Sequence, residues 1–415
     1  MPLSTGSARA TTTSAVPAPP EPLLDDPQAD FLLDPGIDFI NHGPFGARPL
    51  AVLEAQSRRR ADFETRPVEF LDPHRRGGPM LARAKNALGP FIGAQPDNFA
   101  FVANATGSVN AVLRSLTFKT GDELLTTTHV YNAVRQTMKF LVERSGATYR
   151  EIDVPLPLSD DDEVVRAIER GISPQTRLFI IDHVTSPTAV VFPVKRIVEM
   201  CAKRGVDVLI DGAHAPGMLP LNIESINPAY YAGNLHKWVC APLGSAFLWV
   251  RPDRQKGIHP TTISHFLNEG FQAEFGWQAT RDITPWLCVE DALTWLGRLG
   301  WDNIMRHNHQ MAVWAQAMLC EKWKVRSATP LDGRMIGAMA TVPLPSQDVF
   351  RRKFENSAAN WQVVTAMKAA IYDRYRIEVP VIEWQNQWWI RVSCQIYNRP
   401  AQYERLADAV LDLLK

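Results

Sequence analysis

Two short segments hold side chains whose types and order suit covalent chemistry on an amine. Residues 211–214 read DGAH and begin with a carboxylate, and residues 234–238 read NLHKW and contain Lys237. A lysine amine forms a Schiff base with an aldehyde cofactor, and an acidic side chain keeps the ring nitrogen of such a cofactor protonated. Either segment alone would be ordinary, but together they match the needs of pyridoxal 5′-phosphate (PLP). We therefore predict that Lys237 carries PLP and that Asp211 faces its pyridine nitrogen.

A third segment, 104–108 (NATGS), lies between a predicted strand and a predicted helix. Free N–H groups at a helix start, with small residues and hydroxyls, can bind a phosphate group. This interpretation makes Ala105, Thr106 and Gly107 cofactor-binding residues. An ordinary turn capped by Thr106 or Ser108 is equally compatible with the residues. The segment has neither the G-x-G-x-x-G of nicotinamide enzymes nor a Walker-type Lys-Ser/Thr, which argues against NAD and ATP.

These segments lie within a regular alternation of strand-like and helix-like stretches that runs from about residue 98 to 250. Two of the expected strands, 177–182 (RLFIID) and 206–211 (VDVLID), are continuous apolar runs that end in aspartate. Strands buried on both faces have this pattern, as in a parallel sheet covered by helices. We predict a doubly wound α/β domain with a mostly parallel sheet, whose ligands lie beyond the carboxyl ends of the strands. The other expected strands are 98–103, 123–126, 148–154 and 245–250, and the helices between them are centred on 109–116, 132–144, 160–170 and 194–204.

After about residue 290 the pattern changes to long helical stretches, 289–299 and 303–323, followed by isolated strand-like pieces and a final helix at 401–414. This pattern predicts a smaller α+β C-terminal domain. We expect a disordered tail (1–24), a segment packing on both domains (25–60), a large PLP-binding domain (61–288) and the small domain (289–415).

The amino-acid composition limits the classes of partner and compartment that we expect for this protein. Lys+Arg and Asp+Glu both number 44, so the formal net charge is zero and nothing indicates nucleic acid or an anionic membrane. No apolar run approaches the roughly 18 residues of a membrane-spanning helix. The five cysteines show neither metal-ligand spacing nor a disulfide framework. We therefore expect no metal site and a reducing, cytoplasmic compartment.

Several segments resemble those of class V aminotransferase-like enzymes of PLP fold type I, and most of all their isopenicillin N epimerase-like branch. The similarity extends from Phe39 to about Asn398 and is carried by NATGSVNAV, HVYNAV, DHVTSPTAVVFPV, DGAHAPG, NLHKWVCAPLGSAFLWV and IRVSCQIYN. The resemblance implies a homodimer in which Thr280 reaches the phosphate bound by a partner subunit.

The same resemblance implies roles for further residues. Thr106, His236 and Asn234 would bind the phosphate, while Ser186 and His214 would contact the ring hydroxyl. His129 occupies the family position of the residue stacked on the ring, with Tyr131 as the alternative. Arg391 would pair with the substrate α-carboxylate, although from the residues alone it could equally form a surface ion pair. Asn41 and His42 would face the substrate.

The resemblance leaves the reaction open among epimerisation, β-elimination from a cysteine derivative (a C–S lyase) and transamination of an amino acid. We rank an epimerase-like reaction first. Cysteine desulfurases of this family carry a nucleophilic cysteine shortly before the carboxylate-binding arginine. The lack of a cysteine between Cys320 and Arg391 argues against such a persulfide mechanism. A PLP-free binding protein on the same scaffold is the non-enzyme alternative, but the joint presence of Asp211, Lys237 and Arg391 argues against it.

Overall fold

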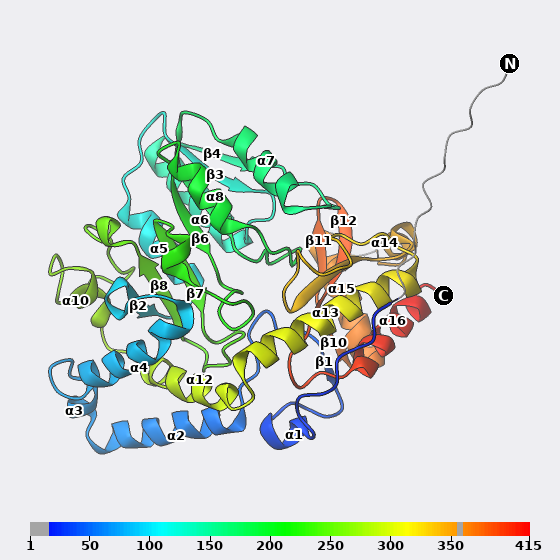
Figure 1. The fold of residues 1–415 in the computed structure, drawn as a ribbon, viewed down its shortest axis with the longest axis horizontal. Coiled ribbons are helices and arrows are strands. Elements are labelled where there is room, and N and C mark those ends of the chain that lie inside the picture. Colours follow the sequence, from blue (N-terminus) through cyan, green and yellow to red (C-terminus); the bar gives the residue numbers. More distant parts are fainter. Residues whose placement is uncertain (1–15, 355–359) are drawn as a thin grey trace.

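A seven-stranded sheet forms the centre of the large domain in the computed structural model, which describes residues 16–354 and 360–415 (Figure 1). All neighbouring strands pair in parallel except β8, which runs antiparallel to both of its neighbours. This confirms the predicted mostly parallel α/β sheet. In spatial order the strands are β2 (Phe99–Val102), β8 (Ala246–Val250), β7 (Tyr230–Asn234), β6 (Asp207–Asp211), β5 (Thr176–Asp182), β3 (Glu123–Thr127) and β4 (Thr148–Ile152).

Helices cover both faces of this sheet, which explains the continuous apolar runs in its strands. Successive side chains of a strand point to opposite faces. Phe179 and Ile181 of β5 enter the core on one face, whereas Leu178 and Ile180 enter the core on the other. The first core is closed by α2 (Leu50–Thr65), α4 (Gly77–Ile92), α7 (Asp161–Gly171), α8 (Val194–Ala202) and α12 (Val289–Gly297), and the second by α5 (Ala105–Ser115), α6 (Asn132–Ser145) and α10 (Phe271–Gly276).

Strand β7 was not predicted, although it leads directly to Lys237. Its sequence, YYAGN, contains two small residues and resembles a loop. The glycine is needed because a Cβ at Gly233 would lie 2.4 Å from the ring of Phe247 on β8. Close packing between neighbouring strands therefore removed the apolar pattern by which the strand could have been recognised.

The smaller domain is built on an antiparallel sheet in the order β11 (Val381–Trp384), β12 (Gln387–Ser393) and β9 (Met339–Pro343), which confirms the predicted α+β character. Its helices are α13 (Trp301–Trp323), α14 (Gln347–Phe354), α15 (Asn360–Tyr375) and α16 (Pro400–Leu413). Helix α12, which the prediction placed in this domain, instead packs on α2 and α4. The shorter elements are α1 (Pro27–Asp30), α3 (Pro67–Leu71), α9 (Ile223–Ile226) and α11 (Thr284–Leu287).

The N-terminal segment joins both domains. Strand β1 (Asp38–Phe39) pairs in parallel with β10 (Ile377–Glu378) of the smaller domain, while α2 packs on the large one (Figure 1). The predicted disordered tail falls mostly on residues 1–15, which lie outside the described residues. Its last residue, Leu24, is buried, and its carbonyl accepts a hydrogen bond from Arg399.

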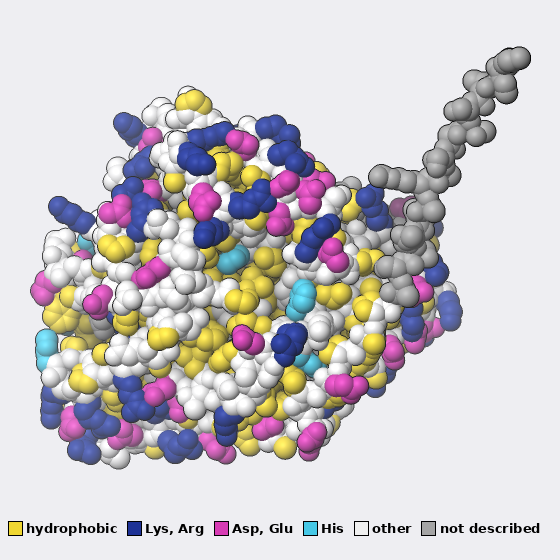
Figure 2. Space-filling view, viewed as in Figure 1, with side chains coloured by type: hydrophobic (Ala, Val, Ile, Leu, Met, Phe, Trp, Pro, Cys, Tyr) yellow, Lys and Arg dark blue, Asp and Glu magenta, His cyan; other side chains and the backbone are white. Residues whose placement is uncertain are grey.

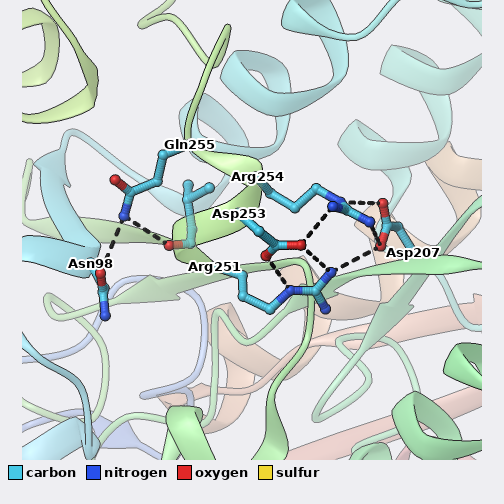
Figure 3. A network of polar contacts seen from close by, with 7 residues as sticks. Asn98, Asp207, Arg251, Asp253, Arg254 and Gln255 are labelled. Carbon is cyan, nitrogen blue, oxygen red and sulfur yellow. Dashed lines mark hydrogen bonds and ion pairs between the residues drawn. The ribbon is translucent and has the colours of Figure 1, made fainter.

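An ion-pair network lies at the end of the sheet where the parallel strands begin (Figure 3). Asp207 opens β6, and its carboxylate accepts from Arg254 at 2.7 Å and from Arg251 at 3.4 Å. Both arginines also bind Asp253. Because β8 runs antiparallel, its C-terminal end lies near the start of β6. The carboxyl ends of the parallel strands all lie at the opposite end of the sheet.

The surface in Figure 2 carries basic and acidic side chains interspersed, in keeping with the zero net charge. Within the described part of the chain, no helix combines the length and apolar character required to cross a bilayer.

Candidate active site

The carboxyl ends of β2, β5, β6 and β7 surround a cavity of about 340 Å³. The connections after these strands supply most of its polar lining. These residues are Asn104, Thr106, Tyr131, Asp182, Ser186, Asp211, His214, Asn234, His236 and Lys237. The cavity therefore brings together residues that lie more than 130 positions apart in the sequence. Its volume is in the range of sites that hold small molecules and cofactors.

Lys237 ends in this cavity, where burial favours the neutral form of its amine. Burial lowers the pKa of Lys237 to about 7, and the nearby carboxylate of Asp211 opposes that effect. The Nζ atom lies 3.1 Å from Nε2 of His214. An indole N–H can only donate, and Trp238 Nε1 donates to Nδ1 of His214 at 3.4 Å, so the proton of the neutral imidazole is on Nε2. His214 thus donates to the lysine nitrogen, and the pKa of His214 is held well below its usual value by burial.

Asp211 ends β6 on the same cavity wall and is 4% exposed. Its Oδ1 atom accepts the backbone N–H of Ala213 at 3.0 Å, and burial raises the pKa of this carboxyl group. The following glycine cannot be replaced, because a Cβ at Gly212 would lie 2.2 Å from the ring of Tyr231. Tyr231 therefore packs directly on the backbone that follows Asp211.

The start of α5 offers donors to an anion. Asn104 caps the helix through Gly107 N–H at 2.7 Å, and Asn234 Oδ1 accepts from Ala105 N–H at 2.8 Å. Two of the three predicted phosphate-binding N–H groups are therefore already used within the described residues, and that of Thr106 is left for a ligand. Because the oxygen of Asn234 is engaged, its Nδ2 amide can donate into the cavity. His236 contributes a ring whose Nδ1 lies 3.1 Å from the carbonyl of Ser245.

Arg391 lies behind the cavity wall formed by Ser186. Its guanidinium donates to the backbone oxygen of Ser186 and to its hydroxyl at 3.3 Å, and burial lowers its pKa to about 10. No carboxylate lies within 4.0 Å of it among the described residues, and its Nε atom has no acceptor there. A buried cation without a counter-ion is costly, so the arrangement suits an anionic group supplied by a substrate.

His129 does not lie on the cavity wall. Its Nδ1 is 2.6 Å from Thr188 Oγ1, its Nε2 is 2.6 Å from the carbonyl of Val154, and its ring packs on Trp384. Both nitrogens are thus used to join loops beneath the site. Tyr131, the alternative, lines the cavity and is 44% exposed. The geometry therefore favours Tyr131 over His129 as the residue beside a bound ring.

Asn41 and His42 are also outside the cavity lining. Asn41 donates to Glu378 at 3.0 Å in the smaller domain. The ring of His42 is fully buried, with Nε2 at 2.9 Å from the carbonyl of Lys237 and Nδ1 at 2.7 Å from the Tyr397 hydroxyl. Instead of facing a substrate, His42 holds the backbone that presents the lysine.

Thr280 lies in a separate cavity of about 510 Å³, lined with Phe63, Phe70 and Arg281 and not with Lys237. Within one chain it does not contribute to the site. Conversely, Asp182 lines the site although the sequence analysis did not single it out. Its signal was the aspartate ending RLFIID, the same pattern that marked Asp211 in the next strand.

Comparison with known proteins agrees with this geometry. A family model described as aminotransferase class V matches residues 52–354. This chain belongs to the class V aminotransferase family. The chain is 30% identical over 401 residues to an isopenicillin N epimerase of Amycolatopsis lactamdurans, covering 92% of this chain and 96% of that protein. It is also 30% identical over 421 residues to a putative L-cysteine desulfhydrase of Oryza sativa subsp. japonica, covering 91% and 83%.

Among solved structures, this class V enzyme is similar to a cystine C–S lyase in complex with cysteine persulfide, with a TM-score of 0.73 and 22% identity over 91% of this chain and 97% of that one. A cysteine desulfurase from Thermococcus onnurineus NA1 gives a TM-score of 0.73 at 18% identity, covering 93% and 96%. At these identities the structures establish the fold, which is PLP fold type I.

The enzyme is PLP-dependent, and the residues of the cavity fit that cofactor. A buried lysine amine, a buried carboxylate and an unused helix N–H are the groups that its aldehyde, ring nitrogen and phosphate require. When bound, PLP supplies an electron sink for cleavage of a bond at the α-carbon of an amino acid. Among the described residues, no cluster of His, Cys, Asp and Glu is placed to hold a metal ion.

Proposed function

We propose that this class V enzyme removes the α-proton of an α-amino acid whose carboxylate is bound by Arg391. The observation that carries the proposal is the buried guanidinium of Arg391. It has no carboxylate within 4.0 Å among the described residues, and it lies behind Ser186, which lines the same cavity as Lys237. A planar guanidinium can bind a carboxylate through two parallel hydrogen bonds. A free amino acid or a peptide with a free C-terminal carboxylate would both supply such a group.

The residues around Lys237 support a role as the base. A pKa of about 7 leaves a large fraction of its amine unprotonated at neutral pH. The His214 Nε2–H holds the amine nitrogen in the cavity. Asp211 would hold the pyridine nitrogen protonated, while Thr106, Asn234 and His236 would bind the phosphate. Ser186 and His214 would lie beside the ring hydroxyl.

An epimerase-like outcome is the first candidate. Returning a proton to the opposite face of the α-carbon requires a second acid, and the Tyr131 hydroxyl is available on the cavity wall. The similarity to isopenicillin N epimerases over nearly the whole chain supports this outcome.

A C–S lyase is the second candidate, favoured by the desulfhydrase relatives. After α-proton removal the bond between the β-carbon and sulfur would break, and the thiol would leave with the bonding electrons. A thiolate is a good leaving group that needs little help from an acid. A persulfide route through an enzyme cysteine lacks support, because all five cysteines are buried and none lines the cavity.

One experiment distinguishes the candidates. The PLP-loaded enzyme is incubated in D₂O with L-cysteine and, separately, with isopenicillin N and simple L-amino acids. Deuterium at the α-carbon with loss of optical purity supports the epimerase-like outcome, whereas release of sulfide and pyruvate supports the lyase. If none of these substrates exchanges its α-proton or yields a product, the proposal of α-proton removal is contradicted.

The role of Arg391 can be tested separately. Replacing it by lysine removes the paired hydrogen bonds but keeps the charge. We therefore expect transition-state stabilisation to fall by about 2 kcal/mol, which is a decrease of roughly thirtyfold in kcat/KM. PLP loading, read from the visible spectrum, should not change. An unaltered kcat/KM would place the substrate carboxylate elsewhere.

We also propose a homodimer, in which Thr280 of one chain binds the phosphate held by the other. Its separation from Lys237 within one chain supports this arrangement, as do the exposed side chains of Phe45 and Leu243 at the cavity mouth. A second copy would cover these apolar groups. The five unpaired cysteines support a reducing compartment such as the cytoplasm.

A further inference from the structure

A second carboxyl group stands beside Asp211 in the cavity. Asp182 ends β5 just as Asp211 ends β6, and the two residues are register partners in this parallel pair. Register partners of parallel strands point to the same face of the sheet. Both side chains line the cavity, and they are only 2% and 4% exposed. The site therefore holds two aspartates side by side where a PLP enzyme needs one.

The surroundings of the two groups are unequal. Asp211 accepts the Ala213 N–H at 3.0 Å, and the Lys237 amine interacts with both carboxyl groups, more strongly with Asp211. Asp182 has no ion pair within 4.0 Å among the described residues, and its Oδ2 atom is buried without a hydrogen-bond partner. The Tyr131 backbone N–H and the more distant Arg135 face it and favour its anion. Burial and the Asp211 charge outweigh them, so the pKa of Asp182 lies well above its usual value.

Two buried carboxylates that end neighbouring strands in register repel each other, so loss of one of the two charges stabilises the pair. We propose that Asp182 and Asp211 form an acid pair that shares one proton, with Asp182 as the protonated member that positions Asp211 toward the cofactor. A protonated carboxyl group is a hydrogen-bond donor. Oδ2 of Asp182 is buried without any other partner among the described residues, and the Asp211 carboxyl group, which ends the neighbouring strand in register, is the acceptor for its proton. The pair keeps a single negative charge, which Asp211 presents to the pyridine nitrogen.

This inference rests on the proposed role of Asp211, but its proton can be observed directly. The infrared spectrum of the PLP-loaded enzyme, labelled with ¹³C-aspartate, is recorded at neutral pH for the wild type and Asp182→Asn. We expect the carbonyl band of a protonated aspartate in the wild type and its loss in the variant. A wild type without the band, or a variant that keeps it, would overturn the acid pair.

Cofactor affinity tests the positioning. An asparagine has the shape of a protonated aspartate and can donate to Asp211, whereas an alanine cannot. Asp182→Asn should therefore bind PLP within about twofold of the wild type and keep its visible spectrum, and Asp182→Ala should bind about tenfold more weakly. If asparagine is as damaging as alanine, the negative charge is what matters and the proposal fails. If neither variant changes binding, Asp182 does not position Asp211.

Asp211→Asn serves as the control that separates the two claims. If it leaves PLP affinity and spectrum unaltered, the proposed role of Asp211 is wrong, and positioning by Asp182 is overturned with it. The infrared band still reports whether the proton is there.

Discussion

At the scale of single residues, the reactivity of this enzyme depends on the protonation of Lys237. Its amine is surrounded by buried groups, and the neighbouring imidazole donates to it rather than accepting from it. Burial disfavours the ammonium form, which lowers the pKa to about 7. An amine with a free electron pair is what attack on the PLP aldehyde requires.

This predicts how cofactor capture depends on pH. Below about pH 7 Lys237 is protonated and cannot attack, so the rate of PLP incorporation into cofactor-free enzyme should rise with pH and level off above about 7. Stopped-flow absorbance measures this rate, and free N-acetyl-lysine is the control, whose rate should keep rising toward about pH 10. A rate that tracks the free amine would contradict a buried neutral lysine. After reduction with borohydride, Lys237→Ala should carry no covalently attached pyridoxyl group.

At the scale of elements, residues 42–46 support the loop that presents Lys237. His42 contacts the Lys237 carbonyl, and Gly46 has a φ of +72° with its Cα facing the carbonyl of His236. A Cβ at Gly46 would lie 2.3 Å from that oxygen. The segment that follows β1 thus supports the candidate site. Asn41 and His42 do not line the cavity as expected, whereas Pro44 and Phe45 do.

Gly46→Ala should therefore lower the free energy of unfolding by more than backbone strain alone would. We expect a loss of about 2–4 kcal/mol in the free energy of unfolding, from the strain of a positive φ plus the overlap with His236. Gly205→Ala is the matched control, since Gly205 has a φ of +69° and no neighbour within 4 Å, and should lose only about 1 kcal/mol. Denaturant unfolding measures both. Equal losses would show that residues 42–46 do not press on the Lys237 loop.

At the scale of the whole molecule, one chain by itself does not bring Thr280 to its own site. The family resemblance implies that Thr280 reaches the phosphate bound by a partner subunit. In this chain that residue lies in an apolar cavity with Phe63 and Phe70. A partner subunit that supplied its own Thr280 would complete the phosphate site and cover exposed apolar surface at the mouth.

Mixing two inactive variants tests this arrangement. Lys237→Ala and Thr280→Ala homodimers are each expected to lack full activity, the second through PLP binding weakened by about 1–2 kcal/mol. In a mixed dimer, one site would combine the intact Lys237 of one chain with the intact Thr280 of the other. One of the two sites in each mixed dimer should then regain native PLP affinity, which is about a quarter of all sites after random subunit exchange at equal concentrations. Absence of recovery in verified mixed dimers would place Thr280 outside the partner's site.

The sequence by itself determined most strands of the large sheet and indicated the cofactor. Apolar runs such as 177–182 predict strands buried on both faces, because only a sheet covered by two layers of helices buries consecutive side chains. The order of Asp211 and Lys237 indicated PLP because few other kinds of site require a carboxylate at the end of a strand together with a lysine after the next element. These inferences depend on local chemistry and period, which a sequence displays directly.

Only the tertiary structure decided which polar residues face the cavity. His129 and Tyr131 are two positions apart, yet the ring of one is buried among loop carbonyls and hydroxyls while the other lines the site. His42 proved to bind the Lys237 backbone, and Asp182 entered the site because its strand pairs in register with that of Asp211. Side-chain direction and strand register depend on contacts between residues far apart in the chain, and no local pattern records them.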